Sequence, residues 1–177
     1  MSSYDFKSKI IDIPDYPQPG IIFRDITPMF SDGECLQQMI AAFAEKYKDM
    51  GITKVVGPEA RGFLIGTPLA AALGAGFVPA RKPGKLPRET TSYSYDLEYG
   101  SNSIEIHTDS IVPGDKVLIV DDLIATGGTA AAAGKLVEQM GAELVGYGVI
   151  IELCYLEPLK ALAQTSSTDL FSLVKFE

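Results

Sequence analysis

Apolar residues recur every three or four positions between residues 31 and 51, a spacing typical of a helix with one buried face. Ser31, followed three residues later by Glu34, has the spacing of a capping box and predicts the first turn of that helix. Gly51 stands where helices commonly end. The side chains expected on the buried face are Leu36, Met39, Ile40, Phe43, Tyr47 and Met50.

From residue 53 onward, short apolar runs alternate with helical stretches. The apolar runs predict strands at residues 53–57, 76–80, 116–120 and 143–152. The stretches between them predict helices near residues 62–73 and 127–140. Strands that alternate with helices pair mainly in parallel and are covered by helices on both faces. The pattern therefore predicts an α/β fold with a mainly parallel sheet flanked by helices.

Two parts of the chain depart from this alternation. A short helix is expected over residues 4–11, and the stretch DIPDYPQPG that follows contains three prolines and a glycine, which exclude regular helix. In residues 92–108, Ile104 and Ile106 alternate with polar residues, which predicts a two-stranded excursion from the domain. His107, the single histidine, alternates outward from these two and is expected to be exposed.

Length and composition narrow the class of protein. A chain of 177 residues fits one domain, residues 1–177, and 46% hydrophobic with 21% charged residues is typical of a packed globular protein. The net charge of −8 disfavours nucleic acid and anionic membranes as partners. Cys35 and Cys154 are too few for a disulfide framework or a zinc site. The chain begins without a signal-peptide pattern and contains no membrane-spanning apolar run, so a cytoplasmic location is expected.

The string KVLIVDDLIATGGT, residues 116–129, carries the clearest chemistry. A buried strand ends in two carboxylates, and a small loop then leads into a helix. In open α/β sheets, ligands bind beyond the carboxyl ends of the strands. Gly127 and Gly128 let backbone N–H groups approach an anion, Thr126 and Thr129 add hydroxyl donors, and the helix N-terminus adds positive potential. A phosphate site at Ala125–Thr129 is therefore predicted.

Asp121 and Asp122 refine this prediction because they would repel a bare phosphate. They are explained if the phosphate belongs to a sugar whose hydroxyls they accept, as in a 5-phosphoribose. Neither GK[ST] nor GxGxxG occurs in this loop, which excludes the common nucleotide-binding motifs there. The alternative is a tight turn followed by solvated aspartates.

A second charged cluster is basic. Arg81, Lys82, Lys85 and Arg88 fall within eight positions of an otherwise acidic chain, which indicates a local anion site or, alternatively, a solvated basic loop. Cations placed around a pyrophosphate leaving group would stabilise the transition state of its departure. The neighbouring Pro83, Gly84 and Pro87 suit a segment that moves over a site as a lid.

Four strings together make the chain resemble the type I phosphoribosyltransferase family, and within it the members that use adenine. They are DYPQPGIIFRDITP, VVGPEARGFLIG, VPARKPGKLPRETTSYSYDLEYG and VLIVDDLIATGGT, and they cover most of residues 15–152. The resemblance implies that family's fold, with an N-terminal hood segment (residues 1–31) and a flexible lid loop and hairpin (residues 81–108). It also implies a homodimer, because the family residue that matches Arg81 can reach the neighbouring subunit's pyrophosphate.

The resemblance also assigns residues. Glu98 matches the catalytic carboxylate that accepts a proton from the purine or holds its reactive tautomer. Glu59, Ala60 and Arg61 match the pyrophosphate loop, whose Glu59–Ala60 peptide is expected to be cis, and pyrophosphate also contacts Arg81, Lys82 and Lys85. The positions that match Ile22 and Phe23 read the adenine, with Arg61 close to it. From the residues alone, Phe23 could equally stack on a purine or fill a hydrophobic gap.

The reaction so implied is Mg²⁺-dependent transfer of 5-phosphoribosyl from phosphoribosyl pyrophosphate to adenine, which yields AMP and pyrophosphate and serves purine salvage. The chain lacks a dense carboxylate cage, so Mg²⁺ is expected to bind mainly through the substrate, with no direct protein ligand. Two alternatives remain open. The acceptor could be hypoxanthine, guanine or xanthine, or the protein could sense phosphoribosyl pyrophosphate and control gene expression without turnover.

Overall fold

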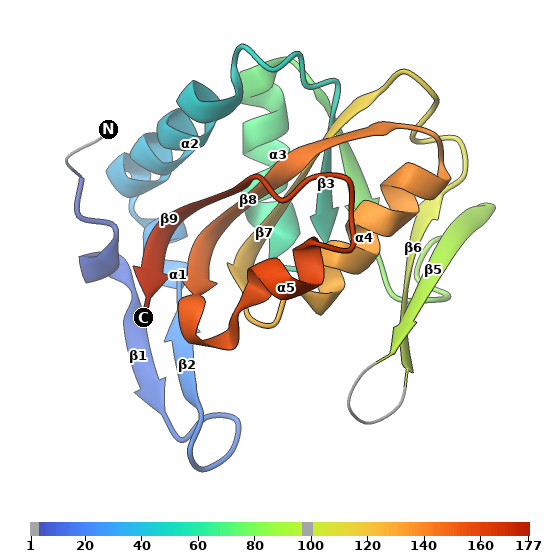
Figure 1. Ribbon diagram of the computed structural model, residues 1–177. Helices are drawn as coiled ribbons and strands as arrows, with labels where there is room; N and C mark the ends of the chain where they lie inside the picture. Colours follow the sequence, from blue (N-terminus) through green and yellow to red (C-terminus); the bar gives the residue numbers. More distant parts are fainter. Residues whose placement is uncertain (1–3, 97–100) are drawn as a thin grey trace.

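The computed structural model describes residues 4–96 and 101–177, and its centre is a five-stranded sheet whose neighbouring strands are all parallel (Figure 1). The strand order is β4-β3-β7-β8-β9. The strands are β3 (Lys54–Pro58), β4 (Gly76–Ala80), β7 (Lys116–Ile124), β8 (Glu143–Leu153) and β9 (Leu170–Phe176). The α/β fold with a mainly parallel sheet flanked by helices is confirmed.

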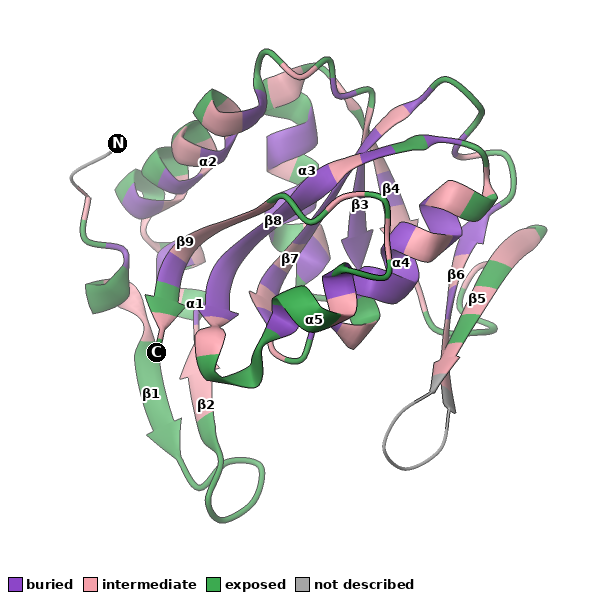
Figure 2. Cartoon of the chain, in the orientation of Figure 1, coloured by how far each residue is buried: buried purple, intermediate pink, exposed green. Residues whose placement is uncertain are grey.

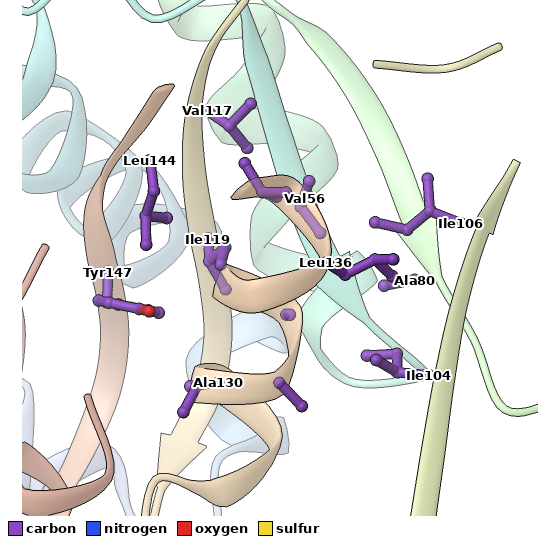
Figure 3. Packing of buried hydrophobic residues seen from close by; sticks show 14 of the residues in the cluster. Val56, Ala80, Ile104, Ile106, Val117, Ile119, Ala130, Leu136, Leu144 and Tyr147 are labelled. Atoms are coloured by element: carbon purple, nitrogen blue, oxygen red, sulfur yellow. The ribbon is translucent and has the colours of Figure 1, made fainter. Parts of the chain in front are cut away.

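Successive residues of the central strands enter different cores because side chains alternate across a sheet. Val55 and Leu118 pack with α2 (Gly33–Tyr47) and α3 (Gly62–Leu73) on one face. Val56 and Ile119 pack with α4 (Gly128–Gln139) on the other face, in the cluster that Figure 3 shows. Burial on both faces explains why these strands read as continuous apolar runs rather than as alternating patterns (Figure 2).

The long N-terminal helix keeps its buried face but starts one residue later than the capping box suggests. Met39, Phe43 and Tyr47 are fully buried. Ser31 is the last residue of a separate short helix, α1 (Thr27–Ser31), and Asp32 is the N-cap of α2. The Asp32 carboxylate accepts hydrogen bonds from the N–H groups of Glu34 and Cys35, so aspartate supplies the cap that was expected from serine.

The chain before α1 differs from the expected helix. Only Lys7–Lys9 form a 3-10 turn, η1, and Ile11–Pro14 form strand β1. This strand pairs antiparallel with β2 (Ile22–Asp25) in a separate two-stranded sheet. The β-branched residues Ile11 and Ile13 favour this extended form, and the pairing with β2 supplies the hydrogen bonds that a helix would otherwise make.

The excursion expected within residues 92–108 is present as an antiparallel pair, β5 (Thr90–Asp96) and β6 (Ser101–His107). Ile104 and Ile106 are buried against α4, as their alternation indicates. The prediction for His107 is wrong, because this residue is only 8% exposed. Its Nδ1 lies 3.4 Å from the carbonyl oxygen of Glu89, which precedes β5.

The C-terminal part contains elements that the sequence pattern did not predict. After β8 the chain forms a 3-10 turn, η2 (Cys154–Leu156), then the short helix α5 (Pro158–Leu162), and finally the edge strand β9. In the described ranges, every helix is too short or too polar to cross a lipid bilayer.

Candidate functional site

The candidate site lies at the carboxyl edge of the sheet. In Figure 1 the arrowheads of β3, β7, β8 and β9 point toward the side of the molecule where the β1–β2 sheet lies. The loops that follow β3 and β7 therefore emerge on this side, and they contain the residues that the sequence singled out. Because β3 and β7 are adjacent and parallel, these two loops are neighbours.

The two aspartates lie within β7 rather than after it. Asp122 is only 4% exposed, and its N–H donates a hydrogen bond of 2.8 Å to Oδ1 of Asp121. The first turn of α3 approaches this pair closely, because a Cβ atom on Gly62 would lie 3.0 Å from Asp121 Oδ1 and 3.1 Å from the carbonyl oxygen of Val120. Burial, and for Asp121 also the neighbouring carboxylate, raises the pKa of both carboxyl groups.

Arg61 connects the aspartates to the N-terminal sheet. Its Nη1 lies 3.0 Å from Asp122 Oδ2, an ion pair whose angles fall outside those of a hydrogen bond. Its guanidinium carbon lies 5.4 Å from the centre of the Phe23 ring, within the range of a cation–π contact. The Arg61 side chain remains 48% exposed, so it can contact a ligand while it holds these two partners.

The loop after β7 has the form expected of an anion site. Gly127 is the N-cap of α4 with φ +84°, a conformation that favours glycine, and its carbonyl oxygen accepts the N–H of Ala131. Thr126 and Thr129 are exposed. A hollow of about 140 Å³ is lined by Asp121, Val149 and residues 123–130. One carboxylate and the whole glycine–threonine loop therefore face a common space.

A second hollow, of about 250 Å³, adjoins the first through Thr129, which lines both. Its lining includes Glu59 and Tyr95 as well as the first two basic residues, Arg81 and Lys82. The expected basic cluster is thus divided. Lys85 does not line this hollow, although its carbonyl oxygen accepts a hydrogen bond from Arg81.

Glu59 organises the cationic side of this second hollow. The Arg81 Nε donates to Glu59 Oε2 at 2.6 Å, and the Lys82 N–H donates to Oε1 at 3.2 Å. Burial alone would raise the pKa of Glu59, but these two hydrogen bonds outweigh it and lower the pKa. The Glu59–Ala60 peptide is cis, as the resemblance led us to expect.

Other predicted residues lie apart or outside the described residues. Ile22 is 52% exposed on β2, and the neighbouring Phe23 ring makes an edge contact with Tyr16, at 5.3 Å between ring centres. Glu98 lies outside the described residues. Arg88 forms an ion pair with Asp109, in a surface hollow of its own.

Two further observations bear on ligands. Among the described residues, no group of three or more histidine, cysteine or acidic side chains could hold a metal ion. A larger hollow, of about 630 Å³, lies against α2 and β9 and contains none of the predicted site residues. The candidate site is therefore identified by the chemistry of its lining residues and not by the size of the hollow.

Tyr95 is a site residue that sequence reasoning missed. Its hydroxyl lies 3.1 Å from that of Thr129, so the β5–β6 hairpin directly contacts the predicted phosphate loop, residues 125–129. The signal was present in TSYSYD, where Tyr93 and Tyr95 alternate with polar residues and therefore share one face of a strand.

Residues 31–164 match the family model described as Phosphoribosyl transferase domain. The chain belongs to the phosphoribosyltransferase family. It is 57% identical over 171 residues to an adenine phosphoribosyltransferase of Shewanella loihica. The aligned region covers 97% of this chain and 94% of that protein. The resemblance to the phosphoribosyltransferases that the four sequence strings indicated is therefore confirmed.

Solved structures of this family have the same fold. The adenine phosphoribosyltransferase of Thermoanaerobacter pseudethanolicus superposes with a TM-score of 0.91 at 48% identity, covering 97% of this chain and 98% of that one. The enzyme of Saccharomyces cerevisiae, in complex with an imino-altritol bisphosphate and adenine, has a TM-score of 0.88 at 44% identity, with 96% of both chains covered. The fold of the type I phosphoribosyltransferases is thereby established for this chain.

Proposed function

We propose that this protein transfers the 5-phosphoribosyl group of phosphoribosyl pyrophosphate to adenine, yielding AMP and pyrophosphate in purine salvage. The observation that carries the proposal is the hollow in which Asp121 and residues 123–130 face a common space. Such a space suits a sugar phosphate, because the loop supplies N–H and hydroxyl donors and the carboxylate accepts from hydroxyls. Relatives named adenine phosphoribosyltransferase, at 53–60% identity, support the choice of reaction.

The proposed roles follow the two adjoining hollows. Ala125, Thr126, Gly127, Gly128 and Thr129 hold the 5-phosphate, and Asp121 and Asp122 hold the ribose hydroxyls. Pyrophosphate lies in the second hollow, where Arg81 and Lys82 supply positive charge and Lys85 adds to it. The backbone of Glu59 and Ala60 and the guanidinium of Arg61 complete that side.

The bond changes are simple. N9 of adenine attacks C1′ of the ribose, the C1′–O bond breaks, and its electron pair leaves with pyrophosphate. The proton that adenine loses passes to a carboxylate, for which we propose Glu98 from its position in the sequence. Ile22, Phe23 and Arg61 hold the purine ring, and the contact between Arg61 and Phe23 supports a base site at this place.

Magnesium is proposed as the cofactor. When bound through the oxygens of phosphoribosyl pyrophosphate, with water completing its shell, Mg²⁺ would neutralise charge that develops on the leaving group. Asp121 and Asp122 are the carboxylates placed to accept hydrogen bonds from the ribose or from such waters. The residues present therefore suit a metal that arrives with the substrate, and we assign no direct protein ligand.

The proposal also includes a cytoplasmic homodimer without nucleic-acid or membrane partners. The net charge of −8 supports the absence of polyanionic partners. Sedimentation of the purified protein at several concentrations would test the dimer, and a monomer at all concentrations would contradict it.

A competition assay tests the reaction itself. The protein is mixed with phosphoribosyl pyrophosphate, Mg²⁺ and equimolar adenine, hypoxanthine, guanine and xanthine, and the nucleotides are separated by chromatography. We expect AMP to dominate and to disappear when the metal is chelated. Another mononucleotide would overturn the base assignment alone, whereas binding of phosphoribosyl pyrophosphate without any product would favour a sensor.

A further inference from the structure

The β5–β6 hairpin has few attachments to the rest of the described molecule. Its strands pair with each other and not with the five-stranded sheet, apart from one bridge between Arg81 and Glu105. The inner side chains of β6, Ile104 and Ile106, are buried against α4. Strand β5 also packs against α4, and its contribution to this cluster is the partly buried Tyr93 and Tyr95.

Tyr95 lies at the junction between the hairpin and the phosphate loop. Its hydroxyl is 3.1 Å from the hydroxyl of Thr129, and its ring carbon Cε2 would lie 3.9 Å from a Cβ atom on Gly128. The same side chain lines the 250 Å³ hollow on one side and a hollow of about 360 Å³, beside α4 and α5, on the other. It therefore contacts the loop at Thr129 and lies beside Gly128.

The chemistry of this contact depends on what the loop holds. Each of the two hydroxyls has one hydrogen to donate, so without a ligand either one can be the donor. When Thr129 donates its hydrogen to a phosphate oxygen, its oxygen is free to accept, and Tyr95 must then be the donor. Hydrogen bonds in such a chain polarise and strengthen one another.

We propose that Tyr95 is a positioning residue that couples the 5-phosphate site to the docking of the β5–β6 hairpin through Thr129. This inference rests on the proposed function, because it takes the ligand of the loop to be a sugar phosphate. The coupling is reciprocal, so a bound phosphate holds the hairpin more firmly and a docked hairpin holds the phosphate more tightly.

The Tyr95→Phe variant tests the coupling because it keeps the ring and removes only the hydroxyl. With ribose 5-phosphate as the probe, we expect Kd to rise by up to about fivefold, the value reached if ligand binding strengthens the Tyr95–Thr129 contact by the net strength of one ordinary hydrogen bond. In the wild type, ribose 5-phosphate should slow amide hydrogen exchange within β5, and in the variant this protection should be largely lost. A role confined to stability of the fold would lower the melting temperature without removing the ligand-induced protection.

Tyr93→Phe is the matched control. Tyr93 lies on the same face of the same strand, and its hydroxyl bonds to no other described residue, so both Kd and protection should remain as in the wild type. The Thr129→Val background provides the second control, because Tyr95→Phe should then have no further effect on Kd. In Thr129→Ser, which keeps the hydroxyl, the fivefold effect should return.

The outcomes separate the inference from the function on which it rests. Equal Kd and equal protection in Tyr95→Phe and the wild type would overturn the coupling while AMP synthesis stands. A fivefold effect that persists in Thr129→Val would also overturn it, because the hydroxyl would then act through another group. Failure of the wild type to bind ribose 5-phosphate would overturn the assignment of the loop itself.

Discussion

Replacing Gly127 by alanine perturbs the proposed phosphate loop, residues 125–129, at a residue that combines a positive φ with close neighbours. Gly127 has φ +84°, and a Cβ atom there would lie 2.7 Å from the carbonyl oxygen of Pro158 and 3.1 Å from Cβ of Ala161. The left-handed conformation costs an L-residue about 1–2 kcal/mol, and forcing an extra carbon into a packed contact costs about 1–3 kcal/mol. The free energy of unfolding should therefore fall by about 2–5 kcal/mol. For a chain of this size the melting temperature should drop by roughly 5–15 °C.

Gly128→Ala is the matched control for this change. The neighbouring glycine has no positive φ, and a Cβ atom on it would meet its nearest neighbours at an ordinary 3.9 Å. Its melting temperature should lie within about 3 °C of the wild type. The two variants are compared by thermal unfolding and by calorimetric titration with ribose 5-phosphate. Equal melting temperatures for Gly127→Ala and Gly128→Ala would refute the view that the positive φ and the close approach of α5 require glycine at position 127.

Three other predictions concern the acidic residues. Glu98→Gln should lower turnover by well over tenfold with a modest effect on substrate affinity, and steady-state kinetics with unchanged turnover would remove Glu98 from the mechanism. Asp121→Asn should weaken ribose 5-phosphate more than Asp122→Asn does, because only Asp121 lines the hollow of the loop, and equal losses in titrations would contradict this. The double Asn variant should lose phosphoribosyl pyrophosphate binding yet melt at a higher temperature than the wild type at pH 7. In the wild type, burial raises the pKa of both carboxyls above that of the unfolded chain, so their ionisation destabilises the native state at neutral pH. The difference in melting temperature should therefore shrink as pH falls, and it should vanish below about pH 3, where the unfolded chain is protonated as well.

The central sheet could be predicted because its strands carry their own signal. Residues 76–80 and 62–73 were expected as a strand and a helix, and the structure has both with these bounds. Strand β7 was expected to end at Val120 but continues to Ile124. Apolar content could not show this extension, because the added residues include two aspartates, although Asp121, Leu123 and Ile124 continue the backbone pairing with β8.

The parts that could not be predicted depend on contacts between distant segments. β1 is exposed along its whole length, so its sequence shows no alternation of buried and exposed positions that would predict a strand. It forms because β2 pairs with it. Asp32 rather than Ser31 caps α2, because Ser31 is the last residue of the preceding helix, α1. His107 is buried and contacts the carbonyl oxygen of Glu89, a contact across the hairpin that the alternation within β6 could not indicate.

The site shows the same division between local and distant information. The loop at Ala125–Thr129 is contiguous, so the string alone predicted it. The contacts of Arg61 with Asp122 and Phe23 join three separate segments, and only the resemblance to a family suggested that these residues share a site.

The structure also bears on how two carboxylates can lie beside the proposed phosphate site. They are not equivalent, because Asp122 faces the guanidinium of Arg61 whereas Asp121 lines the hollow of the loop. The charge of Asp122 is thus compensated within the protein, and burial raises the pKa of Asp121. In the proposed function, the N-terminus of α4 and the loop N–H groups attract the phosphate, and Asp121 accepts hydrogen bonds from sugar hydroxyls. On this proposal the site favours a phosphate attached to a hydroxylated sugar, because inorganic phosphate would meet the carboxylate without offering it a hydroxyl from that direction.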